Sequence, residues 1–342
     1  MKILMIGLGS IGQRHVRNIR KLMGDEAELI AYRSRGLSTT FTDGLQIREG
    51  ISLEEEYGIT PYRDLDEALA QKPEVAFITN ITSKHMECAL ACAKAGCHLL
   101  IEKPLSHSME GVEELKRIAE EKELVVFLGF QNRYHPCVER LKEGVESGKL
   151  GRLSYVACEF SERLTTMHRY EDYRTTYMAR LDMGGGPVLN LQMHDLDILN
   201  HIFGMPTNVR AQLGRDSALS IDVEESAQAV FEFADHLPVY AHTDFLQYPP
   251  VHRFRVVGEK GRLEADLNTV TYTEYLGDEP AKIWSDAGFL RNDMFIRELK
   301  DFFEAVRGEK PSAIPLSAGI DSLRMALAMK QAAAEEKTVR IG

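Results

Sequence analysis

The sequence predicts an α/β protein in which a doubly wound parallel sheet precedes an α+β domain with a large, mostly antiparallel open sheet. Up to about residue 128, short apolar strands alternate with helical stretches, as in a parallel sheet covered by helices on both faces. From about residue 151, long alternating strands follow one another across short turns, which indicates antiparallel pairing. A length of 342 residues favours two domains, which we place at 1–128 and 129–342.

Each predicted element rests on a local apolar pattern bounded by turn signals. The C-terminal helices are amphipathic and are free to pack back on the first domain. The predicted strands are 2–6, 28–33, 59–62, 74–78, 97–101, 124–128, 152–162, 208–213, 224–233, 237–247, 252–257, 261–267 and 269–275. The predicted helices run up to about residue 21 and over about 65–71, 83–95, 108–121, 188–203, 292–307 and 317–335.

Composition and charge restrict the class of partner. The net charge of −11 argues against a general nucleic-acid surface, which needs a basic face, but leaves room for an anionic small molecule in a local basic pocket. No apolar run is long enough to span a membrane, and the first strand begins at Lys2, which leaves no room for a signal peptide. The five cysteines contain no C-x-x-C pair, which indicates buried thiols rather than disulfides or a zinc site. We therefore expect a cytoplasmic protein.

A glycine-rich turn opens the chain. The strand 2–6 is followed at once by Gly7-Leu8-Gly9-Ser10-Ile11-Gly12 and a helix, which is the context in which G-x-G-x-x-G binds a dinucleotide. The first glycine allows a tight turn, the second lets a pyrophosphate approach the backbone, and the third lets the helix pack on the strand. Free N–H groups at the helix start hold the phosphates. This pattern predicts a Rossmann dinucleotide site at Gly7, Gly9, Ser10, Ile11 and Gly12; the alternative is a merely structural turn.

The end of the second strand bears on the choice between NAD and NADP. An NAD site usually has an acid there for the ribose 2′-hydroxyl, whereas arginine suits a 2′-phosphate. Here the strand ends in Arg33, Ser34 and Arg35, without an acid. A guanidinium and a hydroxyl match phosphate geometry, so NADP is favoured and NAD stays possible. The alternative is a solvated basic loop.

A lysine lies at the end of a buried strand. The strand 97–101 stops in Glu102-Lys103-Pro104, because proline cannot donate to a sheet ladder. The carboxyl ends of parallel strands form the ligand crevice, so Lys103 is directed at whatever binds there. The alternative is a strand exit with a solvated lysine. Two further turns, 79–85 and 129–136, follow strands that end at the same edge.

A second group of polar residues follows the glycine run Gly184–Gly186. Asn190 and His194 are four residues apart on the predicted helix 188–203 and so share a face. Histidine carries protons near neutral pH, and a neighbouring carboxylate such as Asp197 would orient its ring. The alternative is a buried structural histidine. A metal is not expected, because His194 and Asp197 provide too few ligands.

The segment 163–180 is dense in arginine and aromatic residues. Planar donors and rings of this kind suit a polar, sugar-sized ligand that carries a phosphate or carboxylate. Tyrosine and arginine are also enriched at subunit contacts, which is the alternative. The residues concerned include Arg163, His168, Arg169, Tyr170, Tyr173, Arg174, Tyr177 and Arg180.

Together these motifs resemble the Gfo/Idh/MocA family of oxidoreductases. The glycine turn, Asn80–His85, Glu102–Pro104, Asn132–Tyr134 and the helix from Asn190 to Asp197 fall in the order of that family and cover nearly the whole chain. The stretch 170–186 is similar to members that act on sugars or nucleotide sugars. The resemblance implies hydride transfer between a nicotinamide and a carbon that bears a hydroxyl or carbonyl group.

The resemblance also implies roles for single residues. Lys103 would contact the reacting oxygen and His194 would be the acid/base, with Asn190 supporting both. The nicotinamide side would be lined by Asn80, His85, Glu102, Lys103 and Asn132. The substrate would be bound by Lys103, Arg133, Tyr173, Arg174, Tyr177 and His194. A broad exposed sheet favours a homodimer or homotetramer.

One departure from the family keeps alternatives open. Many dehydrogenases of the family have aspartate where this chain has Asn190, and an amide cannot serve as a carboxylate. One alternative is an inositol or dihydrodiol dehydrogenase of the same fold. Another is a nucleotide-gated, sugar-sensing regulatory protein without turnover.

Overall fold

The computed structural model describes residues 1–33, 39–42, 44, 46–48, 50–215 and 219–341. Their contacts divide the chain into two compact units. The first consists of Met1–Phe130 and Phe295–Ile320, and the second of Gln131–Met294 and Asp321–Gly342. Each unit is described by itself.

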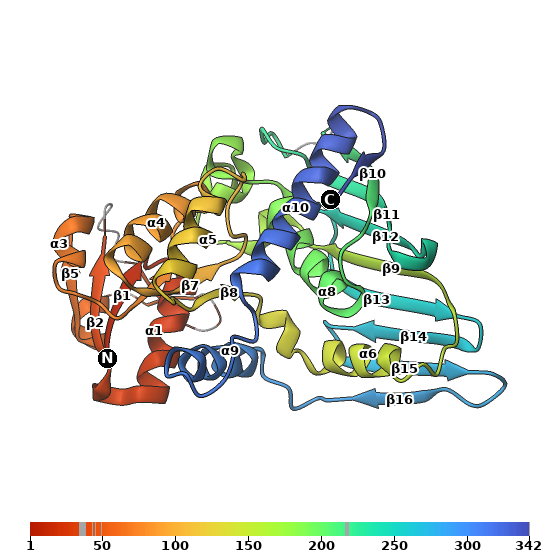
Figure 1. Ribbon diagram of the computed structural model, residues 1–342, viewed down its shortest axis with the longest axis horizontal. Helices are drawn as coiled ribbons and strands as arrows, with labels where there is room; N and C mark the ends of the chain where they lie inside the picture. Colours follow the sequence, from red (N-terminus) through yellow and green to blue (C-terminus); the bar gives the residue numbers. More distant parts are fainter. Residues whose placement is uncertain (34–38, 43, 45, 49, 216–218, 342) are drawn as a thin grey trace. The chain divides into compact units, whose positions relative to one another are not determined.

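The first unit is built on a six-stranded parallel sheet in the order β5-β2-β1-β6-β7-β8 (Figure 1). The order reverses between β1 and β6, which makes the ends of these two strands the crevice of a doubly wound sheet. The predicted Rossmann fold is confirmed. The strands are β1 Lys2–Ile6, β2 Glu28–Tyr32, β5 Ile59–Tyr62, β6 Val75–Ile78, β7 His98–Glu102 and β8 Val126–Gly129. The helices are α1 Ser10–Met23, α2 Leu53–Tyr57, α3 Leu65–Leu69, α4 His85–Ala95 and α5 Val112–Glu121.

Aromatic side chains fill the core of the first unit on one side of its sheet. Phe77 of β6 and Phe127 of β8 both pack edge to face against Phe302, with ring centroids 5.7 Å apart in each pair. Phe302 belongs to α9 Arg291–Val306, whose residues from Phe295 onward lie in the first unit. The periodic apolar residues predicted for this helix are therefore core residues. A small two-stranded sheet, β3 Thr40–Phe41 with β4 Ile47–Arg48, lies in the segment between β2 and α2.

The second unit is built on a nine-stranded sheet in the order β16-β15-β14-β13-β9-β12-β11-β10-β17. All its neighbouring strands are antiparallel except β9 and β12, which are parallel. The predicted open, mostly antiparallel sheet is confirmed. Its strands are β9 Leu153–Ser161, β10 Asn208–Gly214, β11 Ser226–Glu232, β12 Pro238–Asp244, β13 Val251–Gly258, β14 Gly261–Asp266, β15 Thr271–Leu276, β16 Lys282–Ser285 and β17 Val339–Arg340.

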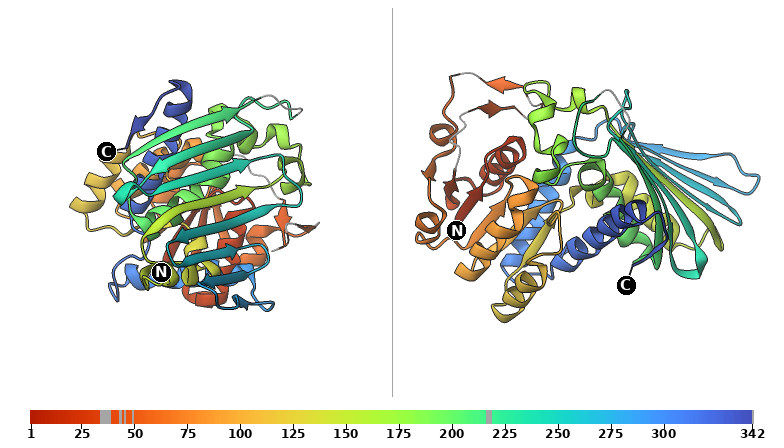
Figure 2. Two further views of the ribbon diagram at one scale, coloured as in Figure 1. Left: turned by 90° about the vertical axis from the view of Figure 1, so that its right-hand side faces the viewer. Right: turned by 90° about the horizontal axis from the view of Figure 1, so that it is seen from above.

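Helices cover one face of this sheet and leave the other open (Figure 2). The helix α6 Pro136–Glu146 packs on β14 and β15, whereas the π-helix Val188–Gln192 and α8 Met193–Phe203 pack on the central strands. The second unit also contains α7 Leu164–Met167 and most of α10 Leu316–Ala334. Because side chains alternate between the two faces of a strand, each strand has one row among the helices and one on the open face.

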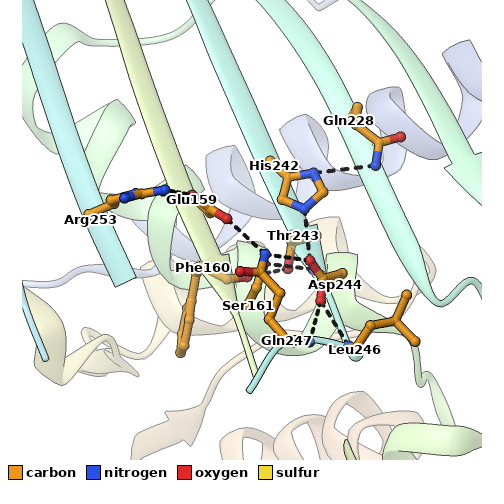
Figure 3. Close-up of polar contacts among 10 residues, drawn as sticks. All are labelled: Glu159, Phe160, Ser161, Gln228, His242, Thr243, Asp244, Leu246, Gln247 and Arg253. Atoms are coloured by element: carbon orange, nitrogen blue, oxygen red, sulfur yellow. Dashed lines mark hydrogen bonds and ion pairs between the residues drawn. The ribbon is translucent and has the colours of Figure 1, made fainter. Parts of the chain in front are cut away.

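On the open face, polar side chains from β9, β12, β13 and the turn after β12 form a hydrogen-bonded cluster (Figure 3). The Asp244 carboxylate accepts hydrogen bonds from the His242 ring at 2.8 Å, from the backbone N–H groups of residues 246 and 247, and from the Gln247 amide. The same Gln247 amide donates to Glu159, which also binds Arg253. These bonds hold the pKa of Asp244 below its ordinary value, against the effect of burial. The cluster fixes the turn that follows β12.

Several features of the second unit differ from the sequence-based expectation, among them α6 and the parallel pairing of β9 with β12. The helix α6 lies in a segment for which no element is predicted, although His135 and Pro136 provide an N-cap and a proline in the first turn. The parallel pairing of β9 with β12 follows from a long excursion of the chain, through the helices between them, rather than from a local turn.

Three properties of the described part of the chain concern membrane spans, metal ligands and thiols. No helix in it is long and apolar enough to cross a membrane. Its histidine, cysteine and acidic side chains form no group of three or more that could hold a metal ion. All five cysteines are free thiols and buried.

A buried histidine makes stability depend on pH. His135 is 3% exposed, its Nδ1 accepts a hydrogen bond from the Cys137 N–H, and burial lowers the pKa of its ring to about 4. The unfolded chain binds a proton as the pH falls below about 6.5, and the folded chain does not. Stability is therefore present above about pH 6.5 and is lost toward pH 4, by up to about 3 kcal/mol from this residue.

We expect His135→Asn to reduce this loss, because asparagine caps helices well and does not titrate. Urea unfolding at pH 7 and pH 5 measures it. His201, whose pKa is also lowered to about 4, stays in both proteins, so the difference between them isolates His135. Equal pH dependence of the two proteins would contradict the assignment.

Candidate active site

The glycine turn between β1 and α1 has the geometry of a dinucleotide site. Gly7 has a φ of +94°, and a Cβ there would lie 2.7 Å from the Asn80 Cα. A Cβ on Gly12 would lie 2.2 Å from the Gly7 carbonyl oxygen, so this glycine allows α1 to start close to the strand. Gly9, by contrast, has no atom of the described residues within 4 Å of its Cβ position. The three glycines thus provide the tight turn, the close packing and the open approach that a pyrophosphate needs.

The start of α1 is suited to an anion. No described side chain caps this helix, whose first residues are Ser10, Ile11 and Gly12. N–H groups in the first turn of an uncapped helix bind phosphate. Next to this turn, Thr79 donates to the Gly7 carbonyl at 2.6 Å, and the buried Asn80 Oδ1 accepts no hydrogen bond from the described residues. The residues present therefore fit a dinucleotide.

His85 connects two turns at the carboxyl edge of the sheet. Its Nδ1 lies 2.8 Å from the carbonyl oxygen of Pro104, and its Nε2 lies 3.1 Å from that of Asn80. Burial lowers the pKa of this ring, although both carbonyls favour its charged form. His85 was expected to line the nicotinamide side; in the structure it holds the turn after β7 against the turn after β6. Both Asn80 and Lys103 project from these turns.

The Glu102 side chain is held by a histidine of α1, the helix that follows the glycine turn. Its carboxylate lies 2.7 Å from the Nε2 of His15 on α1, and both side chains are buried. The rings of Phe77 and Phe295 lie 5.4 Å and 6.1 Å from the His15 ring, so the hydrogen-bonded pair has apolar surroundings. A Cβ at Gly129 would lie 3.1 Å from the Glu102 carboxyl carbon, so the glycine makes room for it. The pair fixes the backbone that leads directly to Lys103.

Of the residues predicted to read the adenosine ribose, only Arg33 is described; Ser34 and Arg35 lie outside the described residues. The Arg33 guanidinium forms an ion pair with Glu54 of α2, and its backbone N–H donates to the Tyr62 carbonyl at 2.9 Å. Burial lowers the pKa of this guanidinium. A carboxylate that the sequence pattern did not indicate is therefore next to the arginine.

In the second unit, Asn190 and His194 lie on consecutive helical segments and are each 6% exposed. The predicted helix is present, but its first turn, Val188–Gln192, is a π-helix that leads into α8. Turns of this kind occur frequently at functional sites. The Asn190 N–H donates to the Gly186 carbonyl at 3.0 Å, so the helix begins at the glycine run.

The glycine run is packed against a buried ion pair. Gly186 has a φ of +100°, and a Cβ there would lie 2.3 Å from a carboxylate oxygen of Glu224. Glu224 is fully buried, and Lys330 of α10 lies within 3.2 Å of both its oxygens. Only glycine fits at position 186, because the Glu224 carboxylate occupies the place of a Cβ. The pair therefore helps to set where the Asn190 helix begins.

Asp197 was expected to orient the His194 ring, and in the structure its carboxylate binds an arginine that is distant in the sequence. Both Asp197 oxygens bind the Arg133 guanidinium, at 2.8 Å from Nε and 2.6 Å from Nη2. A planar guanidinium holds a carboxylate best in this two-bond geometry, and the pair is buried. Arg133 was expected to bind substrate, and in the structure its guanidinium binds the Asp197 carboxylate. Its neighbour Asn132, expected near the cofactor, is buried in the second unit.

A buried network that the sequence did not indicate lies beside His194. Asp195 is fully buried and binds the His252 ring at 2.8 Å. The His252 ring stacks on Phe160 with centroids 3.9 Å apart and planes 3° apart, and the Phe160 ring lies 6.1 Å from that of His194. His252 is 57 residues from Asp195 in the sequence, so no local pattern could have found this pair.

The segment 163–180 forms short helical turns that are attached to the second unit. The Tyr173 hydroxyl donates to the Leu219 carbonyl at 2.9 Å, and Tyr173 and Tyr177 pack on a cluster that contains Phe245. Arg174 is exposed, and its guanidinium donates three hydrogen bonds to the Asp172 carboxylate. The tyrosines are thus partly structural, and Arg174 is the most accessible of the predicted substrate residues.

Comparison with protein-family models agrees with this geometry. Residues 1–130 match the model described as "Oxidoreductase family, NAD-binding Rossmann fold", and residues 138–264 match "GFO/IDH/MocA C-terminal domain". The chain belongs to the Gfo/Idh/MocA family. The predicted resemblance is confirmed, and the family supports an oxidoreductase with an NAD-binding fold.

Individual members of the Gfo/Idh/MocA family are similar over the whole length. Myo-inositol 2-dehydrogenase from Thermotoga maritima is 28% identical, over 100% of this chain and 98% of that protein. The structure of levoglucosan dehydrogenase with NADH has a TM-score of 0.85 at 16% identity, over 100% and 99% of the two chains. That of the WlbA dehydrogenase from Chromobacterium violaceum with NADH and UDP-GlcNAcA has a TM-score of 0.79 at 19% identity, over 100% and 96%. These two structures share the fold.

The buried Glu102–His15 pair gives a prediction for this family member. In His15→Leu the Glu102 carboxylate stays buried without its donor, and we expect the free energy of unfolding to fall by about 3 kcal/mol. His15→Gln keeps an N–H donor and should lose less. Urea unfolding of the two variants measures the difference; a leucine variant as stable as the glutamine variant would contradict the assignment.

Proposed function

We propose that this protein is an NAD(P)-dependent oxidoreductase that transfers a hydride between the nicotinamide and a hydroxyl or carbonyl carbon of a sugar or nucleotide-sugar derivative. The observation that carries the proposal is the glycine turn, in which Gly9 is open and Gly7 and Gly12 are closely packed. The names of the relatives, which include an inositol dehydrogenase and the D-glucoside 3-dehydrogenase of Escherichia coli, support a polyhydroxyl substrate. In this proposal residues 1–128 bind the cofactor and residues 129–342 bind the substrate.

Each proposed role follows from the chemistry of one side chain. The bound nicotinamide supplies or takes up the hydride. The Lys103 ammonium polarises the carbonyl or stabilises the alkoxide, and the imidazole of His194 carries the proton. Asn190 donates or accepts a hydrogen bond but holds no negative charge, so it supports the other two. Asn80 and the start of α1 hold the cofactor, with Glu102 and His85 keeping the turn of Lys103 in place.

A second candidate substrate is a cyclic polyol. Its support is the match to myo-inositol 2-dehydrogenase over the full length of the chain. Trans-1,2-dihydrobenzene-1,2-diol dehydrogenase from Bos taurus is 28% identical over 64% of the chain and 61% of that protein. A sensor without turnover is the alternative that the amide of Asn190 keeps open.

The test of the function is a turnover screen. We expect at least one sugar, cyclitol or UDP-sugar to change the absorbance of the nicotinamide in the presence of the protein. Lys103→Ala and His194→Asn should each lower kcat by roughly 100-fold or more, because each removes a polarising or proton-carrying group. Their affinity for the reduced cofactor, measured by its fluorescence, should stay within about twofold. Cofactor binding with no turnover of any compound would favour the sensor.

For the cofactor we propose a preference for NADP over NAD, supported by Arg33 and by the absence of an acid at the end of β2. Glu54 opposes it, because a 2′-phosphate would compete with this carboxylate for the guanidinium. We therefore expect Glu54→Gln to bind NADPH more tightly than the unmodified protein, and Arg33→Ser to bind it about tenfold more weakly while keeping its affinity for NADH. Fluorescence titration of NADPH with all three proteins, and of NADH with the unmodified protein and Arg33→Ser, gives these constants. Tighter binding of NADH than of NADPH by the unmodified protein would overturn the proposal.

We also propose that the protein is a cytoplasmic homo-oligomer that associates through the open face of the nine-stranded sheet. This face is hollowed into a cavity of about 840 Å³. Its charges balance, with Arg210, Arg253 and Arg255 against Glu159, Glu264 and Asp266, although the chain carries −11. A face of balanced charge does not repel a second copy of itself. Val230 and Tyr240, which pair across β11 and β12, are 42% and 49% exposed.

We expect light scattering to give a dimeric or larger mass, and Tyr240→Glu to reduce it. The matched control is Leu290→Glu, since Leu290 is a 64% exposed apolar residue outside the sheet. A monomeric unmodified protein would exclude the interface.

A further inference from the structure

A buried thiol to which the proposed function gives no role, Cys88, contacts Asn80 beside the glycine turn. The Asn80 Nδ2 donates a hydrogen bond to the Cys88 sulfur at 3.3 Å. Cys88 lies in the first turn of α4 and is 5% exposed. Burial raises the pKa of this thiol, although the bond from Asn80 favours its charged form. Near neutral pH the sulfur is therefore an uncharged acceptor, which does not repel an anion bound nearby.

The backbone of Asn80 is fixed as well. Its carbonyl oxygen lies 3.1 Å from the Nε2 of His85, which is in the same turn of α4 as Cys88. On the other side, a Cβ on Gly7 would lie 2.7 Å from both the Cα and the N of Asn80, so this backbone packs directly against the glycine turn. The backbone and the amide nitrogen of Asn80 thus have defined positions, and the amide oxygen remains.

The Asn80 Oδ1 is buried and accepts no hydrogen bond from the described residues. A buried acceptor without a donor is unfavourable unless a ligand or water donates to it. The oxygen and nitrogen of a planar amide diverge, so Cys88, which binds the nitrogen, does not also satisfy the oxygen. Asn80 follows β6, at the point where the strand order reverses and a doubly wound sheet binds its ligand.

Because the remaining atom is an acceptor, it selects the part of a dinucleotide that can donate. Phosphate oxygens at neutral pH do not donate, so a pyrophosphate suits the N–H groups at the start of α1. Ribose hydroxyl groups do donate. In the sheet, β2 and β6 flank β1 on opposite sides. A dinucleotide whose adenosine ribose lies at the end of β2, next to Arg33, therefore has its other ribose on the side of Asn80.

We propose that Cys88 is a positioning residue for the cofactor: its sulfur holds the Asn80 amide so that Oδ1 accepts a hydrogen bond from the ribose that carries the nicotinamide. The inference rests on the proposed function. Without an acceptor at position 88, both orientations of the amide become accessible, and only one of them presents the oxygen. Cys88 acts through Asn80 alone, so its effect on binding should disappear when position 80 has no amide.

The experiment measures the affinity for NADPH and NADH, by cofactor fluorescence, in Cys88→Ala, Cys88→Ser and a matched control, Cys92→Ala. Cys92 is a second thiol of α4, one turn further along, and is 0% exposed. We expect Cys88→Ala to weaken the reduced cofactor about threefold to tenfold, because the orienting hydrogen bond is lost. Cys88→Ser, whose hydroxyl also accepts, should stay within about twofold of the unmodified protein, as should Cys92→Ala.

Two further comparisons separate positioning from a structural role. In the double variant Cys88→Ala/Asn80→Ala, the affinity should equal that of Asn80→Ala alone, because a residue that acts through the amide has no effect once the amide is gone. ADP-ribose contains the second ribose, whereas ADP ends at the pyrophosphate. Cys88→Ala should weaken ADP-ribose by the same factor as the reduced cofactor and leave ADP unchanged, which displacement of bound cofactor measures.

The outcomes that would overturn the inference are distinguishable from failure of the proposed function. If the unmodified protein binds the cofactor and Cys88→Ala behaves like Cys92→Ala, the thiol positions nothing while the proposed function stands. The same holds if Cys88→Ala weakens binding equally with and without the Asn80 amide, or weakens ADP as much as ADP-ribose. If the unmodified protein binds neither NADPH nor NADH, the proposed oxidoreductase fails and the role of Cys88 fails with it.

A second variant keeps the test decisive if Cys88→Ala does not fold. Cys88→Val removes the acceptor and fills the space of the thiol, so the comparisons with Cys88→Ser, with the Asn80→Ala background and between ADP-ribose and ADP apply to it unchanged. Thermal unfolding of each variant identifies those that are folded at the temperature of the titrations.

Discussion

The backbone contact between the glycine turn and the end of β6 is the constraint on which the first unit depends. A Cβ on Gly7 or Gly12 would lie within 2.7 Å of backbone atoms. The backbones of β1, α1 and the end of β6 therefore meet without side chains between them. Close approach here opens the crevice where the strand order reverses. It also places Asn80 beside the phosphate turn. The His85 ring then links the turn of Asn80 to the turn that contains Lys103, because it binds a carbonyl oxygen in each.

Local patterns predicted most of the strands and helices, because burial imposes a period of two or 3.6 residues on the sequence. The predicted strands of the parallel sheet agree with the observed ones within a residue or two, and the helix with His194 is found where expected. What local patterns do not encode is which strands pair. The parallel contact between β9 and β12 joins residues about 80 positions apart, and its register depends on packing of the whole unit.

The candidate site divides in the same way. The glycine turn, Lys103 and His194 could be selected from sequence because each lies in a short motif with a chemical reason for its spacing. The partners of these residues could not. His15 is 87 residues from Glu102, and Arg133 is 64 residues from Asp197, so their pairing becomes visible only in three dimensions. Helical spacing indicated that the Asp197 carboxylate is near His194, but it could not indicate the distant guanidinium that binds this carboxylate.

The five buried thiols are divided between the two units. Cys88, Cys92 and Cys97 lie in the first, and Cys137 and Cys158 in the second. A buried thiol reacts with a reagent in solution only when the structure around it opens, and the rate reflects the free energy of that opening. The chain therefore contains natural labelling positions in both halves. Reaction of these thiols, followed by mass spectrometry with and without NADH, reports how ligand binding stabilises each half without any introduced probe.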